Sequence, residues 1–137
     1  MENPIKKSFD VNPIGIIISP LTNLEDCPLQ ESENAPEAYL EIYDPFREGI
    51  KDIRPGDKLI ILTWFHLADR KIIKCYRRKE VGSEKFGVFS TRSPDRPNPI
   101  GLHTVTVLEV VNEYKLKIYP IEALSGTPVI DIKPSLN

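Results

Sequence analysis

The chain has 137 residues, of which 40% are hydrophobic and 28% charged, and its net charge at pH 7 is −2. These values are typical of one globular domain with a buried core, so we expect a single domain over residues 1–137. The apolar runs are far shorter than the roughly 20 residues of a membrane helix, and no signal-peptide pattern precedes them, which predicts a cytoplasmic protein.

Prolines and short β-branched runs alternate along the chain. The 13 prolines are spread throughout, and because proline removes a backbone donor and fixes φ, a helix-rich fold is excluded. Strands are expected, in chain order, at residues 14–19, 39–43, 58–65, 102–111, 115–119 and 129–132. A short helix is expected at Pro45–Ile53, with proline in its first turn, and a hairpin at Val110–Lys117, with Asn112-Glu113 at its tip. The prediction is an all-β, largely antiparallel barrel or sandwich.

The charges are unevenly distributed. Nine acidic residues lie between Thr22 and Asp52, whereas six basic residues and no acidic one lie between Arg70 and Lys79. A basic cluster of this kind is typical of phosphate-backbone binding, although a solvated strand edge would have the same pattern. The candidate RNA contacts are Lys74, Arg77, Arg78 and Lys79.

Residues 92–101 form the most unusual segment, with three prolines and two arginines in ten residues. Proline stiffens a loop and so reduces the entropy lost when the loop is held in place. A stiff loop that contains Arg92, Asp95, Arg96 and Asn98 is a preorganised set of donors and acceptors, as binding and catalytic sites require. The alternative is a crossover whose arginines pair with the acidic N-terminal third.

The chain has few residues for disulfide or metal chemistry. Cys27 and Cys75 show no Cys-x-x-Cys spacing, so we expect two reduced thiols. His66 and His103 have no clustered carboxylate partners in the sequence, which predicts no metal site.

Several motifs resemble the TsaA-like family. Residues 87–102, GVFSTRSPDRPNPIGL, closely resemble the signature of that family. Residues 14–20, the Phe65-His66 pair and residues 124–134 are similar to its opening strand, its central aromatic-histidine pair and its closing motif. The resemblance covers nearly the whole chain in the right order. The characterised bacterial members are tRNA (N6-threonylcarbamoyladenosine-37)-N6-methyltransferases.

The resemblance implies a small, mostly antiparallel β-barrel with one or two short helices that works as a homodimer. It also implies S-adenosylmethionine as cofactor, held without a Rossmann domain, and this sequence has no Gly-x-Gly-x-x-Gly motif. Carried over by position, the cofactor contacts are Pro28, Leu29, Gln30, Phe65, His66, Arg92, Leu102, Ile121, Glu122, Ala123 and Leu124. Arg96, Asn98 and Asp131 form a further motif group.

Physical chemistry suggests a role for some of these side chains. Phe65 can stack on adenine or contact the sulfonium, and the Arg92 fork suits the methionine carboxylate. Glu122 can accept from a ribose hydroxyl or the amino group. The acceptor of the adenine N6 proton is expected to be Asp95 or His66. Each has a purely structural alternative: Phe65 as core, His66 as a satisfied structural residue, Glu122 as a surface charge and Asp95 as a turn organiser.

Two features depart from the family pattern. The chain ends just after the closing motif, so we expect a short form without the C-terminal domain of the bacterial enzymes, and Ser135 stands where an aromatic residue is usual. Three functions therefore stay open. The first is methylation of N6 of (threonylcarbamoyl)adenosine 37 in the tRNA anticodon loop, with Asp95, His66, Arg96 and Asn98 as catalytic candidates. The others are methylation of another substrate, such as a small molecule, and cofactor binding without catalysis.

Overall fold

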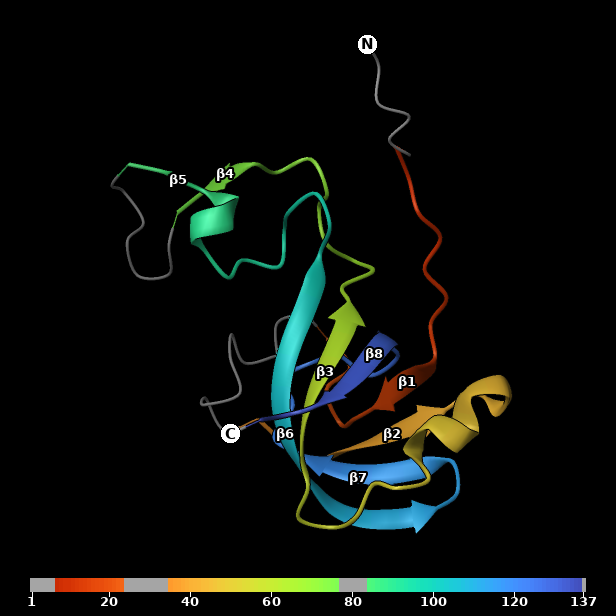
Figure 1. Cartoon of the computed structure of the whole chain (residues 1–137). Helices are drawn as coiled ribbons and strands as arrows, with labels where there is room; N and C mark the ends of the chain where they lie inside the picture. The colour runs from red at the N-terminus through yellow and green to blue at the C-terminus, as the bar shows by residue number, and fades with distance from the viewer. Residues whose placement is uncertain (1–6, 24–34, 77–83, 137) are drawn as a thin grey trace.

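The computed structural model describes residues 7–23, 35–76 and 84–136. These residues form short strands and two 3₁₀ helices (Figure 1). The elements are β1 (Gly15–Ile18), β2 (Ala38–Ile42), η2 (Asp44–Ile50), β3 (Lys58–Trp64), β4 (Lys74–Cys75), β5 (Phe86–Gly87), η3 (Val88–Ser90), β6 (Ile100–Asn112), β7 (Lys115–Tyr119) and β8 (Pro128–Pro134).

Six of these strands close a barrel in the order β1-β2-β7-β6-β3-β8, with every neighbouring pair antiparallel. The prediction of a small, mostly antiparallel β-barrel is therefore confirmed. The 13-residue β6 pairs with β3 along its first half and with β7 along its second half. Register shifts near Val107 and Val110 interrupt the second ladder. Because bulges bend a strand, they allow β6 to turn between its two neighbours and close the barrel.

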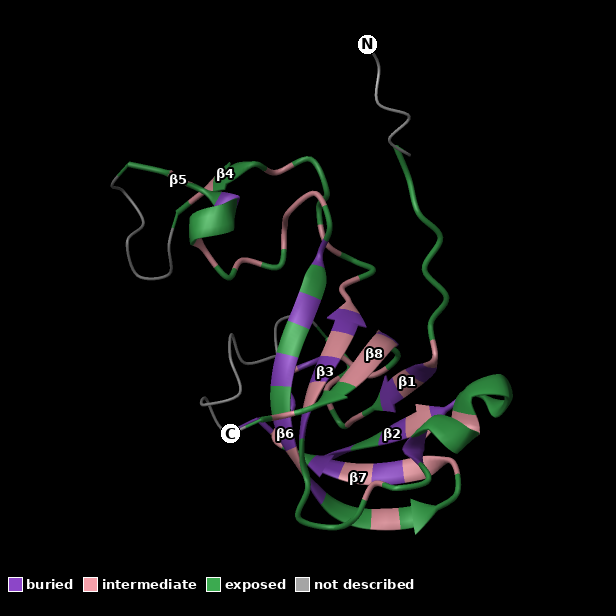
Figure 2. Ribbon diagram, in the orientation of Figure 1, coloured by how far each residue is buried: buried purple, intermediate pink, exposed green. Residues whose placement is uncertain are grey.

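Alternate residues of the barrel strands point into the core, as the banding in Figure 2 shows. The innermost side chains are at most 1% exposed: Ile17, Leu40, Ile61, Val105, Val107, Leu116, Ile118 and Val129. Burying each such side chain contributes about 1.5–3 kcal/mol. The period-two pattern that predicts the strands is thus also the pattern that fills the barrel.

The structure differs from the predicted elements in three places. The helix expected at Pro45–Ile53 is a 3₁₀ helix at Asp44–Ile50, and the residues after it continue with i→i−3 bonds such as that from Ile53 N to Ile50 O, 3.1 Å. The hairpin turn lies one residue later than expected, at Glu113-Tyr114. The small β4–β5 sheet was not predicted, because two-residue strands have no readable period.

Among the described residues, no helix is long and apolar enough to cross a membrane. Nor do these residues contain a group of three or more histidine, cysteine, aspartate or glutamate side chains that could hold a metal ion. Cys75 is a half-buried free thiol, whereas Cys27 lies outside the described residues.

Candidate functional site

The barrel topology brings three long connections to one end. Because neighbouring strands are antiparallel, the C-terminal ends of β1, β3 and β7 meet the N-terminal ends of β2, β6 and β8. Residues 19–37, 65–99 and 120–127 therefore all leave the barrel at the same end, which we call the connection end. Every predicted cofactor contact lies in one of these connections, except Leu102, which lies near the start of β6. Pro28, Leu29 and Gln30 fall outside the described residues.

A chain of buried polar groups lies inside the barrel near this end. His103 is on β6, is fully buried and contacts a neighbour through each ring nitrogen. Its Nε2 atom lies 2.7 Å from Oγ1 of Thr63 on β3. Its Nδ1 atom lies 2.5 Å from Oε1 of Glu122 in the 120–127 connection. Since unpaired buried polar groups are costly, these bonds fix the three side chains relative to one another.

Glu122 keeps one oxygen for another partner. One of its two oxygens, Oε1, is hydrogen-bonded to Nδ1 of His103. The Oε2 atom is buried and has no hydrogen-bond partner among the described residues. The Glu122 side chain is 12% exposed overall. A fixed carboxylate with a free oxygen can accept a hydrogen bond from an N–H or O–H of a small ligand.

An aromatic ring lies beside this polar chain. Phe65 is the residue after the end of β3. Its ring packs edge to face against the His103 ring, with the two centroids 5.9 Å apart. Gly101 lies opposite Thr63 in the β3–β6 ladder. Because glycine has no side chain, it leaves space there for the Phe65 ring and the Thr63 hydroxyl. A Cβ at residue 101 would lie 2.4 Å from both Oγ1 of Thr63 and Cζ of Phe65. Gly101 is therefore required by close packing at the site.

The 120–127 connection is anchored to the opening strand. Ser125 N and Gly126 N donate to Leu21 O and Ile17 O, both at 2.7 Å. Ile121 and Ala123 are buried at 0% and 2% exposure and belong to the core. Glu122 and Leu124 are half-buried. Of the four predicted contacts in this segment, Glu122 is thus the one whose side chain has polar chemistry to offer.

The proline-rich loop is fixed by internal bonds. Arg96 donates through Nη2 to Val88 O and to Thr91 O, the latter at 2.7 Å. Asp95 Oδ1 accepts from Asp69 N at 2.8 Å.

Arg70 connects the loop to β3. It donates to Pro97 O at 2.7 Å and to Asn98 Oδ1 at 3.2 Å, and its guanidinium lies 5.0 Å from the Trp64 ring centroid. The expected preorganisation is therefore present. Neither Arg92 nor Arg96 forms an ion pair with an acidic residue in the described ranges. Glu25, Asp26, Glu31 and Glu33 of the acidic N-terminal third fall outside those ranges, so the crossover alternative is not tested.

The remaining predicted residues are dispersed. His66, Arg92 and Lys74 are exposed on the 65–99 connection, and Leu102 is 47% exposed on β6. Asp131 lies on β8 and pairs with Lys133 at 2.8 Å, so it does not join Arg96 and Asn98 through any described bond. Arg77, Arg78 and Lys79 fall outside the described residues.

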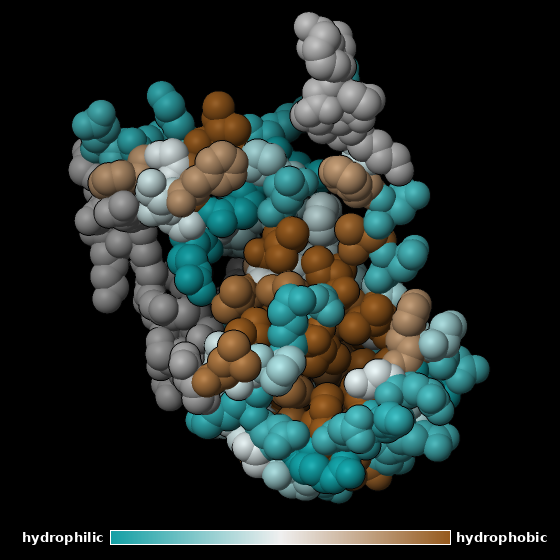
Figure 3. All heavy atoms as spheres, viewed as in Figure 1, coloured by the Kyte–Doolittle hydropathy of each residue, from teal (hydrophilic) through white to brown (hydrophobic). Residues whose placement is uncertain are grey.

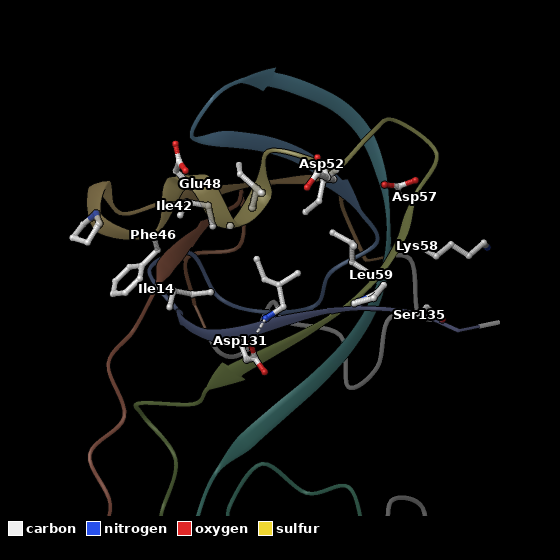
Figure 4. A pocket seen from close by; sticks show the side chains of 16 residues that line it. Ile14, Ile42, Phe46, Glu48, Asp52, Asp57, Lys58, Leu59, Asp131 and Ser135 are labelled. Atoms are coloured by element: carbon white, nitrogen blue, oxygen red, sulfur yellow. Dashed lines mark hydrogen bonds between the residues drawn. The ribbon is translucent and has the colours of Figure 1, made fainter.

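A cavity of about 760 Å³ lies at the opposite end of the barrel, between η2 and the strand ends. Figure 3 shows hydrophobic side chains gathered in the middle of one face of the barrel within a hydrophilic border. In Figure 4, Ile14, Ile42, Phe46 and Leu59 line the cavity, and the acidic residues Glu48, Asp52, Asp57 and Asp131 lie around it. This cavity is lined mainly by apolar side chains, whereas the buried polar chain and the preorganised loop are at the connection end.

Sequence reasoning missed the central role of His103 and Thr63. In the sequence, His103 stands out only as a possible metal ligand, and Thr63 only as one residue of the strand expected at 58–65. A usable signal is the alternation in β6, where the inward positions are Gly101, His103, Val105 and Val107. One ionisable residue among such positions requires a buried partner, and that indicates a polar site.

Comparison with known proteins places these observations in a family. The family model described as the tRNA-methyltransferase O N-terminal domain matches residues 16–137. A Methanocaldococcus jannaschii protein named a probable S-adenosyl-L-methionine-binding protein is 43% identical over 129 residues, covering 91% of this chain and 90% of its own. An Archaeoglobus fulgidus S-adenosyl-L-methionine-binding protein is 39% identical over 123 residues, covering 90% and 86%.

Solved structures agree with this result. Two crystal structures of TrmO from Pseudomonas aeruginosa superpose with TM-scores of 0.75 and 0.73, at 31% and 32% identity. The matches cover 98% and 94% of this chain but only 57% and 56% of the crystallised chains. This chain therefore spans little more than half the length of those proteins.

Proposed function

Because this chain belongs to the tRNA-methyltransferase O N-terminal domain family, we propose that it is an S-adenosylmethionine-dependent methyltransferase that acts on N6 of adenosine 37, or its threonylcarbamoyl derivative, in tRNA. The observation that carries the proposal is the family match over residues 16–137. The names of the archaeal relatives support the cofactor.

The residues of the connection end fit this cofactor. S-adenosylmethionine has hydrogen-bond donors on its ribose and amino group, an adenine face, a carboxylate and a sulfonium cation. Glu122 has a buried oxygen that no described residue bonds, which can accept from a donor. Phe65 has a ring for a flat or cationic group. The exposed Arg92 forms no ion pair with a described residue, and its guanidinium suits a carboxylate. His103 and Thr63 hold Glu122 in place.

The bound cofactor supplies an electrophilic methyl group. The protein then has to align the adenine nitrogen with that group and exclude water, which fixed side chains do better than mobile ones. Asp95 and His66 remain proposed acceptors of the N6 proton. Asp95 has one oxygen committed to Asp69 N, which leaves its other oxygen for that task.

The proposed tRNA contacts lie on the 65–99 connection. Lys74 and Arg92 are exposed there and form no ion pair with a described residue. Cations of this kind bind phosphates and give affinity that falls with salt. We also propose the family's homodimer for this chain, which sedimentation at micromolar concentration tests directly.

A second candidate function is cofactor binding without catalysis. The specific observation in its favour is that the archaeal relatives are named for S-adenosylmethionine binding and not for methyl transfer. In that case the protein would bind the cofactor and leave it intact.

Methyl transfer from labelled S-adenosylmethionine separates these functions. The purified protein is incubated with tRNA, with tRNA lacking the threonylcarbamoyl group, and with a small-molecule extract. Label in adenosine 37 of tRNA supports the proposal. Label only in small molecules supports a different methyltransferase, and cofactor binding without label in any acceptor supports the non-catalytic candidate.

A further inference from the structure

Phe89 is an exposed aromatic residue on an ordered turn. It lies in η3 and is 83% exposed. Leu67, Ile73 and Tyr76 of the same 65–99 connection are also exposed, at 58%, 64% and 40%. Figure 1 shows this part of the chain standing off the barrel, and Figure 2 shows η3 mostly exposed. Several exposed apolar side chains on one connection make it a candidate contact surface.

The turn that presents Phe89 is held on both sides. The preceding Val88 is 1% exposed, and its N–H donates to Ile73 O at 3.0 Å. Its carbonyl accepts from the backbone and the hydroxyl of Thr91, at 3.0 and 2.9 Å, and from Arg96. A ring on such a turn is preorganised and loses little conformational entropy when a partner covers it.

Three cations lie close to this turn in the chain or in the β4–β5 ladder. Lys74 lies opposite Gly87 in the β4–β5 ladder, and Gly87 is two residues before Phe89 in the chain. Lys85 precedes β5 and lies with its Nζ atom 5.5 Å from the Tyr76 ring centroid. Arg92 is exposed just after η3. None of the three forms an ion pair with a described residue.

We propose that Phe89 is a stacking platform for an unpaired RNA base and that Lys74, Lys85 and Arg92 hold the flanking phosphates. An exposed aromatic ring together with nearby cations is the combination that binds single-stranded nucleic acid. A symmetric contact with a second copy of the chain would bring the same cations together, so the charge favours a polyanion. The platform rests on the proposed function, which supplies RNA as the substrate.

The test compares aromatic and aliphatic residues at this position. Binding of a fluorescent oligoadenylate and of a tRNA transcript is measured for the wild type, F89A, F89L and F89W at low salt. Stacking requires a π face, so F89A and F89L should both weaken binding at least about fivefold, the lower bound for one stacked base. F89W should retain affinity, and its added tryptophan fluorescence should be quenched by RNA. The sequence has one tryptophan, Trp64, so the wild type supplies the background.

Each outcome has a definite meaning. If the wild type and F89A bind RNA with equal affinity, the proposal of a stacking platform at Phe89 is overturned and the proposed function is left intact. Weakening in F89A but not in F89L identifies an apolar contact and also overturns it. A change of sedimentation coefficient in F89A with unchanged RNA affinity assigns the surface to a second copy. Absence of RNA binding by the wild type, together with absence of label in tRNA, overturns the proposed function as well.

Discussion

Replacement of Gly101 by alanine tests the packing of the candidate site. The new Cβ would lie 2.4 Å from Oγ1 of Thr63 and from Cζ of Phe65. Favourable carbon contacts are about 3.5–4.0 Å, so these atoms must move by about 1 Å. Phe65 can swing outward, but Thr63 is fully buried in β3. Overpacking costs about 1–3 kcal/mol, and breaking the Thr63–His103 bond adds about 1–3 kcal/mol. We expect G101A to lose at least about 2 kcal/mol of unfolding free energy.

Urea unfolding measures this loss, and titration calorimetry with S-adenosylmethionine measures the accompanying loss of affinity. The matched control is G87A, because a Cβ at Gly87 meets nothing within 4 Å. It reports the effect of the glycine-to-alanine change on the unfolded chain alone. A G101A protein that is as stable as G87A and binds the cofactor like the wild type would refute the site geometry.

Three further predictions follow from individual contacts. Arg96→Met removes a charged donor from Val88 O and Thr91 O. The backbone amide hydrogens of Val88 and Thr91 should then exchange with solvent about tenfold faster or more. Unchanged hydrogen-exchange rates at these two amides would contradict the role of Arg96. Neutralising Lys74 and Arg92 together should reduce the slope of log affinity against log salt by about 0.7 for each lost phosphate contact; an unchanged slope would mean that they do not contact RNA. The carboxylate of Glu41 raises the pKa of Lys115, mainly through a side-chain hydrogen bond. The ion pair therefore stabilises the fold below the ordinary lysine pKa of 10.5, and this stabilisation is lost as the pH rises above it. In urea unfolding, the wild type should have a higher free energy of unfolding than E41Q at lower pH, and the difference should disappear above that pKa.

The barrel was predictable because its core positions alternate along β3, along β7 and along the first half of β6. The 92–101 loop was predictable as a rigid element because its prolines limit the backbone whatever surrounds them. The buried polar chain was not predictable, because its residues are far apart in sequence: His103 is 40 residues from Thr63 and 19 residues from Glu122. Strand register brings Thr63 near His103, and no sequence period encodes register between distant strands. The exposed Phe89 was equally hidden, because its surroundings depend on the β4–β5 pairing.

The separation of charge into an acidic N-terminal third and a basic run was also visible in the sequence. What these charges do depends on tertiary position. Glu37 and Glu41 pair across the β2–β7 ladder with Lys117 and Lys115 at 3.2 and 3.0 Å, so part of the acidic segment is neutralised locally. The cations of the 65–99 connection have no such partners in the described ranges. The described residues of the 65–99 connection include six cations and three carboxylates, so the net charge of −2 hides a local excess of positive charge on that connection.

The most direct test of where the cofactor binds is titration calorimetry of S-adenosylmethionine with the wild type and two isosteric variants. Glu122→Gln removes the carboxylate at the connection end, and Asp52→Asn removes a carboxylate that lines the cavity at the other end. We predict micromolar binding by the wild type, about −8 kcal/mol, a loss of tenfold or more in E122Q, and no change in D52N. Tight binding by E122Q together with weakened binding by D52N would place the cofactor in the opposite cavity and contradict the account.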